Sequence, residues 1–226
     1  MIGWKGLFKE LGNRIVWLLC PMHCPYCDRL IGYHDTECGQ CAQTLSGNAF
    51  ERELPGGGSC RAPFEYKGGV REALHRFKFG GDLNAAKSFS KHLADVMKKH
   101  TSGFDAVTNV PLSIRSLKKR GYDQTEIIAR RLSVLLDKPF TPALVKIKQN
   151  KVQHSLRASE RERNPAGCYA PVDKDAIRGK RLLLIDDIAT TGFTMAECRS
   201  VLLEAGAASV ECAVVAFAVL EAPAKT

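Results

Sequence analysis

The sequence predicts an α/β protein in which helices flank a mostly parallel sheet, with a small N-terminal zinc ribbon before it. Two features lead to this fold class. From residue 61 onward, stretches with helical periodicity alternate with short apolar runs, an order typical of βαβ units. Before residue 54, two Cys-x-x-C pairs stand ten residues apart, a spacing that lets four thiolates meet at one metal ion.

The alternating segments can be placed from their periodicity. Helices are expected over 85–99, over 126–136 and from Thr194 to Gly206. Strands are expected over 104–110, 182–185 and 210–219. The run 182–185 is apolar throughout, which is typical of a parallel strand covered on both faces. Thr194 and Glu197 form a capping-box pattern at the start of the third helix.

A proline followed by three glycines within residues 54–59 indicates a loop or linker. We expect a domain boundary there, between residues 1–54 and residues 61–226. The first part is expected to hold an amphipathic helix and then the zinc ribbon. The apolar residues that recur at helical spacing in this helix are Leu7, Leu11, Ile15 and Leu18. So small a module buries little apolar surface, so metal binding would supply much of its folding free energy.

The chain has nine cysteines, an odd number, and no secretion signal, which argues against a disulfide framework. The expected metal ligands are Cys24, Cys27, Cys38 and Cys41. Four protein ligands close a zinc site, so the metal would be structural. Cys20, His23 and His34 are spare donors that could replace a cysteine, but the four symmetric thiolates are the preferred set.

The net charge of +9 is concentrated between residues 111 and 165, where 13 basic residues face 5 acidic ones. Such a region favours a polyanionic partner, either nucleic acid or a phosphate-rich small molecule, and a solvated basic face is the alternative. No apolar run reaches the length of a membrane span, and charges are scattered through the apolar N-terminus. We therefore expect a cytoplasmic protein without a transmembrane segment.

The predicted strand 182–185 leads to Asp186 and Asp187 at the carboxyl edge of the sheet, where ligands bind in parallel folds. A loop of small residues follows, and its backbone N–H groups, its hydroxyls and the helix N-terminus would together bind a phosphate. The residues expected to do so are Ala189, Thr190, Thr191, Gly192 and Thr194. Because two carboxylates would repel that phosphate, we expect them to bind ribose hydroxyls, with a divalent metal bridging to further phosphates.

Residues 182–194 resemble the phosphoribosyl-pyrophosphate motif of type I phosphoribosyltransferases. Over nearly the whole chain, the order of motifs is similar to that of the ComF family, bacterial competence proteins that join a zinc ribbon to a phosphoribosyltransferase domain. Besides the cysteine pairs and the acidic loop, the matching segments are Tyr66, Arg71, Lys78-Phe79-Gly80-Gly81-Asp82, Val110-Pro111-Leu112, Lys119-Arg120-Gly121-Tyr122-Asp123-Gln124, Gln153 and Arg161 to Asn164.

The resemblance implies a type I phosphoribosyltransferase-like fold in which Asp186 and Asp187 bind ribose hydroxyls and the loop holds the 5′-phosphate, with Mg²⁺ accompanying phosphoribosyl pyrophosphate. It also places the basic residues where type I enzymes carry a pyrophosphate loop and a flexible hood. The residues that would meet either pyrophosphate or DNA are Arg115, Lys118, Lys119, Arg120, Lys148, Lys151, Arg157 and Arg161. Aromatic side chains that could stack on bases are Tyr122, Phe140 and Tyr169.

Two functions follow from these observations. The ComF resemblance implies a competence-associated protein for natural transformation, which binds incoming single-stranded DNA in the cytoplasm and works beside a competence helicase and DNA-loading proteins. The alternative is a Mg-dependent phosphoribosyltransferase that acts on an unidentified base or nucleotide in salvage. The loop at Ala189 and Thr190 lacks the acid that some purine enzymes use as a general base, which excludes that subclass but not catalysis. The sequence identifies no catalytic residue.

Overall fold

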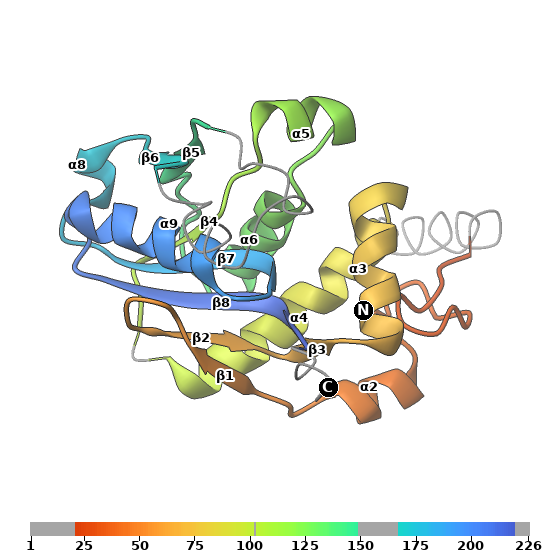
Figure 1. Ribbon diagram of the computed structural model, residues 1–226. Helices are drawn as coiled ribbons and strands as arrows, with labels where there is room; N and C mark the ends of the chain where they lie inside the picture. Colours follow the sequence, from red (N-terminus) through yellow and green to blue (C-terminus); the bar gives the residue numbers. More distant parts are fainter. Residues whose placement is uncertain (1–20, 102, 149–166, 220–226) are drawn as a thin grey trace, which may run out of the picture.

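The computed structural model describes residues 21–101, 103–148 and 167–219, and most of these build one six-stranded sheet and its covering helices (Figure 1). The strands are β1 (Phe50–Glu53), β2 (Ser59–Ala62), β3 (Phe64–Tyr66), β4 (Ala106–Asn109), β5 (Leu144–Lys146), β6 (Tyr169–Pro171), β7 (Arg181–Ala189) and β8 (Ser209–Ala218). The helices are α2 (Gly39–Leu45), α3 (Gly68–Gly80), α4 (Leu83–His100), α5 (Ile114–Arg120), α6 (Gln124–Leu135), α8 (Lys174–Ile177) and α9 (Phe193–Glu204). The amphipathic helix expected before Cys20 lies outside the described residues.

The strand order of the sheet is β1-β2-β8-β7-β4, and β3 pairs with β8 beyond the end of β2. Every pairing is parallel except that of β1 with β2. The predicted class, a mostly parallel sheet flanked by helices, is therefore confirmed. In the centre, residues Leu182–Ile185 of β7 are fully buried, as their unbroken apolar pattern predicts.

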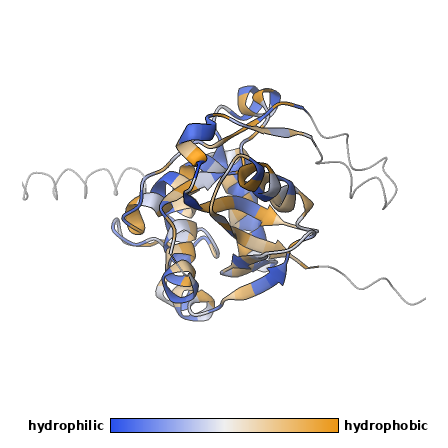
Figure 2. Cartoon of the chain, turned by 90° about the vertical axis from the view of Figure 1, so that its left-hand side faces the viewer, coloured by the Kyte–Doolittle hydropathy of each residue, from blue (hydrophilic) through white to orange (hydrophobic). Residues whose placement is uncertain are grey.

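Successive side chains of β7 point to opposite faces of the sheet and enter two separate cores. Leu183 and Ile185 pack with the helices α3, α4 and α6. Leu182 and Leu184 pack on the other face, with Cys198 of α9. Figure 2 shows apolar residues on the central strands and polar residues on the outer surfaces of helices and loops. The alternation matters at the end of β7, where it sends two acidic side chains in opposite directions.

Strand β7 is longer than the sequence indicates. It was expected to end at Ile185, but its ladder with β8 continues through Asp186 and Ala189, so both acids belong to the strand. The capping-box prediction is wrong: the N-cap of α9 is Gly192, which has no side chain to cap the helix. Glu197 instead accepts a hydrogen bond of 2.6 Å from the backbone N–H of Gly167. Glu197 thus pairs with a residue far away in the sequence and not with the start of its own helix.

The glycine-rich segment 54–59 forms the turn of the β1–β2 hairpin. The backbone N–H of Leu54 donates to the carbonyl of Gly58 at 2.8 Å, and three successive glycines have positive φ, where other residues are strained. Strand β1 precedes the expected domain boundary, yet it joins the sheet of the second part. The turn therefore connects two neighbouring strands of one sheet.

A buried carboxylate fastens the cysteine-rich module to α4. Glu37 accepts hydrogen bonds from Ser88 (2.6 Å) and from Nε2 of His92 (2.9 Å), and Lys91 lies at 3.5 Å. Burial opposes its ionisation, but the hydrogen bonds from His92 and Ser88 hold the pKa of Glu37 below its ordinary value. The carboxylate next to Cys38 is thus a fixed contact between the module and the helical layer.

Two further features complete the part of the molecule that the structure describes. Strands β5 and β6 form a separate antiparallel pair that contacts α9. Helix α5 buries none of its residues and stands at the top of the molecule in Figure 1. None of the helices described here combines the length and the apolar character needed to cross a bilayer.

Candidate functional site

Asp187 lies at the carboxyl end of β7 and turns toward α3 and α6. Its Oδ2 accepts a hydrogen bond of 2.8 Å from Nε2 of Gln124 and lies 3.0 Å from Nζ of Lys78. The residue is only 5% exposed. A buried carboxylate needs such partners, because removing it from water without them is costly. Asp187 is therefore neutralised from inside the protein.

Asp186 turns to the opposite face, and its Oδ1 accepts a hydrogen bond of 2.8 Å from the backbone N–H of Asp187. Burial by the surrounding protein atoms, together with the negative charge of Asp187, raises its pKa to about 8. Its apolar neighbours on this face include Cys198, whose own thiol pKa burial raises well above the ordinary value. The backbone N–H of Asp187 and the charge of Lys78 balance the charge of Asp186 only in part, and hydroxyl donors or a divalent cation would complete that balance.

The loop that follows β7 lies at the surface of the protein. Thr190 and Thr191 are exposed, Ala189 is buried, and Thr194 is partly exposed in the first turn of α9. Gly192 has φ of 81°, and a Cβ there would lie 3.0 Å from Cδ2 of Leu54 in the hairpin turn. Only glycine meets both conditions without strain. The loop thus has exposed hydroxyls beside a helix N-terminus, while its role in binding phosphate stays a prediction.

The basic residues of α5 differ in their surroundings. Arg115, Lys118 and Lys119 are exposed. Arg120 is partly buried, donates to Oε1 of Gln124, and lies over the ring of Phe79, 5.3 Å from its centroid. Because Gln124 also donates to Asp187, a chain of hydrogen bonds joins the basic helix to the acid pair.

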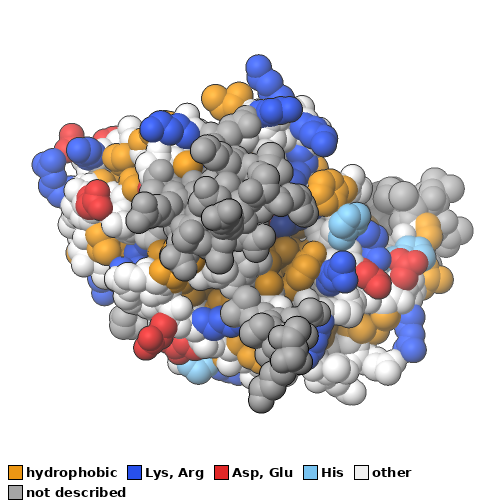
Figure 3. Space-filling view, viewed as in Figure 1, with side chains coloured by type: hydrophobic (Ala, Val, Ile, Leu, Met, Phe, Trp, Pro, Cys, Tyr) orange, Lys and Arg blue, Asp and Glu red, His pale blue; other side chains and the backbone are white. Residues whose placement is uncertain are grey.

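Other predicted basic residues are farther along the chain. Lys148 is exposed just beyond β5. Lys151, Arg157 and Arg161 lie outside the described residues. Figure 3 shows that Lys and Arg side chains gather over α5 at the top of this face. The structure therefore links Arg120 of α5 to Asp187 through Gln124, and it does not describe the basic residues 151–161 of the expected hood.

The aromatic side chains expected to stack on bases are not available. The hydroxyl of Tyr122 donates to the carbonyl of Phe77, Phe140 lies under the guanidinium of Arg130, and Tyr169 is buried. The most exposed aromatic side chain among the described residues is Phe79, with 67% of its surface accessible. Helical geometry explains the difference, because residues two apart on α3 point to opposite sides, so Phe79 faces out where Phe77 faces the core.

Sequence reasoning also missed Lys78 and Gln124 as partners of Asp187. Both stand inside segments that match the ComF motifs, but no local pattern relates them to a residue in β7. The sequence offers one signal for Lys78. It follows the last apolar residue of the helix face that ends at Phe77, and a lysine so close to a buried face can indicate an acidic partner.

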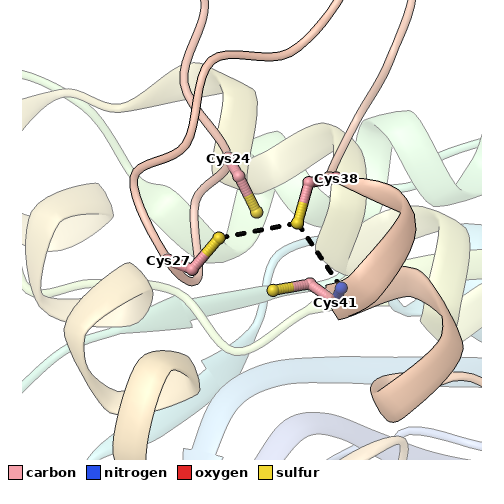
Figure 4. A group of neighbouring side chains, drawn as sticks. All are labelled: Cys24, Cys27, Cys38 and Cys41. Carbon is pink, nitrogen blue, oxygen red and sulfur yellow. Dashed lines mark hydrogen bonds between the residues drawn. The ribbon is translucent and has the colours of Figure 1, made fainter.

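The four cysteines predicted as ligands meet at one point (Figure 4). All their sulfur atoms lie within 4.8 Å of one another, and those of Cys27 and Cys38 are 3.5 Å apart. Tetrahedral zinc with Zn–S bonds of ~2.3 Å requires S···S distances of ~3.8 Å, so this set fits the metal. The backbone N–H of Cys41 lowers the pKa of the Cys38 thiol to about 7, whereas burial and the neighbouring thiols raise the pKa of Cys41. A cation at the centre of the cluster would favour the thiolate form of all four.

The two spare donors that the structure describes, His23 and His34, take no part in this cluster. Nδ1 of His23 donates to the carbonyl of Asp28 at 2.8 Å, and the ring of His34 packs edge-on against Tyr33. Cys20 lies outside the described residues. The preferred set of four thiolates therefore agrees with the geometry, and the local turns of both pairs explain why spacing alone found it.

Comparison with known proteins gives the class of the molecule. Residues 81–226 match the model of the phosphoribosyl transferase domain family, and the chain belongs to this family. Among solved structures, the glutamine phosphoribosylpyrophosphate amidotransferase of B. subtilis is 23% identical, with a TM-score of 0.40, over 57% of this chain and 25% of that chain.

Full-length relatives place the chain more narrowly. It is 28% identical over 203 residues to the DNA utilization protein YhgH of Escherichia coli K12, covering 83% of this chain and 87% of the relative. It is 27% identical over 219 residues to the competence protein ComFC of Bacillus subtilis 168, covering 92% and 86%. The competence protein F of Haemophilus influenzae is 26% identical over 196 residues, covering 84% and 82%. The resemblance to the ComF family is therefore confirmed.

The cysteine cluster yields a first prediction. Cys38→Ser should abolish stoichiometric zinc binding and lower Tm by ~10 °C or more, because a structural zinc contributes several kcal/mol and each kcal/mol shifts Tm by ~2–4 °C in a chain of this size. Zinc content by atomic emission and Tm by calorimetry would measure this. His23→Ala should leave both unchanged, and a loss of zinc in that variant would contradict the four-cysteine site.

The raised pKa of Asp186 yields a second prediction. Its folded-state carboxyl keeps its proton between pH 4 and about 8, where the unfolded chain has lost it, so stability falls as the pH rises through this window. Asp186→Asn keeps the acceptor for the Asp187 N–H and removes the charge. At pH 8 its free energy of unfolding should exceed that of the wild type by on the order of 1–3 kcal/mol.

This difference should disappear near pH 4, where the wild-type side chain is neutral as well. Urea unfolding at several pH values would measure it. A difference that is constant from pH 4 to pH 8 would show that Asp186 is ionised throughout, contrary to the shielding inferred from its surroundings.

Proposed function

We propose that the protein binds single-stranded DNA at the carboxyl edge of its sheet, in the cytoplasmic uptake of transforming DNA, and that the pocket at Asp186 takes a phosphosugar. The names of its relatives, competence proteins and a DNA utilization protein, support the biological setting. In this role, the ComF resemblance implies a helicase and DNA-loading proteins as partners.

The observation that carries the DNA proposal is the exposed ring of Phe79 among cations. Arg120 lies 5.3 Å from its centroid and His75 packs against it at 4.8 Å. An exposed ring beside positive charge is a platform on which a base of any identity can stack, at ~1–3 kcal/mol per base. Single-stranded DNA fits this surface better than a duplex, whose bases are already stacked.

The neighbouring helix extends the platform with charge. Lys118 and Lys119 of α5 are exposed, and so is the apolar residue Leu117 that precedes them. Such residues would contact the phosphate backbone without reading base edges, so binding should be tolerant of sequence and sensitive to salt. In this proposal, the part of the basic stretch that lies on α5 would contact the DNA backbone.

The phosphosugar proposal rests on the acid pair and the loop that follows. Asp186 would accept hydrogen bonds from ribose hydroxyls, and the loop from Ala189 to Thr194 would hold the 5′-phosphate with N–H groups and hydroxyls. Asp187 would reach the sugar only in competition with its donors Lys78 and Gln124. The ligand proposed is phosphoribosyl pyrophosphate or a similar phosphosugar.

Two metals belong to this proposal. The four thiolates would hold zinc in a closed, structural site. Mg²⁺, which prefers oxygen ligands and is held largely by substrate phosphates, would arrive with phosphoribosyl pyrophosphate. Asp186, whose carboxyl otherwise keeps its proton up to about pH 8, would give up that proton where such an ion balances its charge.

A transferase acting on an unidentified base is the second candidate, favoured by the membership of the phosphoribosyl transferase domain family. The loop from Ile188 to Gly192 has no titratable side chain to act as a base. A transferase would therefore work by positioning and charge stabilisation. Release of pyrophosphate in the presence of a panel of bases would establish this second function.

For DNA binding, Phe79→Ala should weaken binding to a labelled oligothymidine by ~5- to 100-fold, the range expected for the loss of one stacked base. Lys118→Ala and Lys119→Ala should each reduce the slope of log K against log salt by ~0.7. Fluorescence anisotropy at four salt concentrations would measure both quantities.

Phe79→Trp should retain the affinity, because it keeps an aromatic face. Lys99→Ala is the matched control, since this exposed lysine in the last turn of α4 lies toward the amino ends of the strands. If the α5 and Phe79 variants bind the oligonucleotide with wild-type affinity and with the wild-type salt dependence, DNA does not bind at α5 and Phe79.

For the phosphosugar, saturating phosphoribosyl pyrophosphate with Mg²⁺ should raise the Tm of the wild type by several degrees, since ligand at 100 Kd stabilises by ~2.7 kcal/mol. Asp186→Asn should remove this ligand-dependent increase. Asp175→Asn, an exposed acid on α8, is the control. Full protection of Asp186→Asn by the ligand would show that the sugar binds elsewhere.

A further inference from the structure

A groove of about 620 Å³ lies between α4 and α6, and the function proposed above does not use it. The two helices pack closely there, and Oγ of Ser90 on α4 donates to the carbonyl of Ile128 on α6 at 3.3 Å. None of its lining residues belongs to the acid pair, to α5 or to the cysteine cluster. The groove is therefore a separate feature of the helical layer.

The floor of the groove is an apolar stripe on α6. Val134 is 81% exposed and Leu135 is 44% exposed, and Ile127 precedes Val134 by seven residues, two turns along the same side. Helix α6 already buries Ile128 and Leu132 against the sheet. It thus has a second apolar stripe on its outer side, where Ile127 is partly buried against the core and Val134 and Leu135 are exposed.

The rim of the groove is positive. Lys87 and Lys91 line it from α4, and Arg130 and Arg131 line it from α6. Two acids face these cations: Glu37 lies 3.5 Å from Lys91, and Glu126 lies 2.7 Å from Arg130.

The other two cations have no such partner. Lys87 and Arg131 make no ion pair within the residues that the structure describes, although both remain in reach of solvent. The groove therefore has four cations around an aliphatic floor and only two acids beside them. It is complementary to a surface that is apolar in the middle and acidic at its edges.

We propose that this groove binds an acidic amphipathic helix of a partner protein. Leucine-type side chains at i, i+3 or i+4, and i+7 would pack on Val134, Leu135 and Ile127, whose span on α6 is ~12 Å at 1.5 Å per residue. Carboxylates on the flanks of that helix would pair with Lys87 and Arg131. Helix-in-groove binding of this kind derives its affinity from the apolar anchors and its orientation from the charges.

Two other occupants fit less well. A second copy of this chain carries a net charge of +9, so it would bring a like charge to a basic rim. A nucleic acid would be attracted by the rim, but the floor has valine, leucine and isoleucine where stacking needs aromatic rings. The acidic helix alone satisfies both the floor and the rim.

The test uses the full chain and two labelled helical peptides of equal length. Both have leucines at i, i+3 and i+7, and one has glutamates on its flanks where the other has lysines. We expect the glutamate peptide to bind with micromolar affinity and the lysine peptide at least ~10-fold more weakly, in line with the specificity that charge gives to an interface. Fluorescence anisotropy measures both.

The double substitution Lys87→Glu and Arg131→Glu should reverse the preference between the peptides, and Val134→Ser should weaken both. These residues are on the surface, and circular dichroism would verify that the variants fold. Lys99→Glu, which changes a lysine of α4 outside the groove, should bind both peptides as the wild type does.

Three results would overturn the proposal. One is a glutamate peptide that fails to bind, or that binds the groove variants unchanged. Another concerns DNA. If the double variant Lys87→Glu, Arg131→Glu loses as much affinity for single-stranded DNA as Phe79→Ala does, the groove is part of a nucleic-acid surface. The third is a change of oligomeric state in Val134→Ser by sedimentation, which would make it a contact between copies.

Discussion

The ion pair of Asp187 with Lys78, together with the hydrogen bond from Gln124, is the interaction on which the edge of the sheet at the end of β7 depends. It brings together α3, α6 and β7, three elements separated by long stretches of chain, at the point where the parallel strands end. It also makes the acid pair asymmetric. Asp187 has two internal donors, whereas Asp186 has a backbone N–H and only the more distant charge of Lys78, so its carboxyl keeps a proton where that of Asp187 has donors. A ligand that supplies hydroxyl donors or a cation would complete what the fold leaves incomplete.

The same constraint connects the acid pair to the basic surface. Gln124 donates to Asp187 and accepts from Arg120, and Arg120 in turn lies over the exposed ring of Phe79. A ligand that moves Asp187 would therefore act on the position of Arg120 through a single amide. Because the three side chains share hydrogen-bond partners, their contributions to binding should be non-additive, as is usual within one network. The two ligands proposed above, a phosphosugar and single-stranded DNA, would thus meet at one connected group of side chains in this member of the phosphoribosyl transferase domain family.

The cysteine module contacts α4 through Glu37, away from the acid pair. Glu37, next to Cys38, is held by Ser88 and His92, so the order of the metal cluster and the position of α4 are coupled through a buried carboxylate. The outer surface of α4 is also one wall of the basic groove. If the four thiolates bind zinc, loss of the metal would therefore disturb α4 as well, because breaking a buried, hydrogen-bonded charge cluster is costly in free energy.

The sequence by itself determined the class of fold, the four cysteines and the strand that leads to the acids, because each depends on spacing or periodicity within a few residues. It did not determine where β7 ends, that residues 54–59 form a hairpin turn, or which acid is neutralised, since each of these depends on a partner strand or on a side chain far along the chain. Phe79 shows the difference most directly. Its neighbours in sequence are a buried Phe77 and a half-buried Lys78, and only the packing of α3 decides which ring enters the core and which meets solvent. Local patterns fix the elements, while long-range contacts decide what each side chain touches, and binding depends on those contacts.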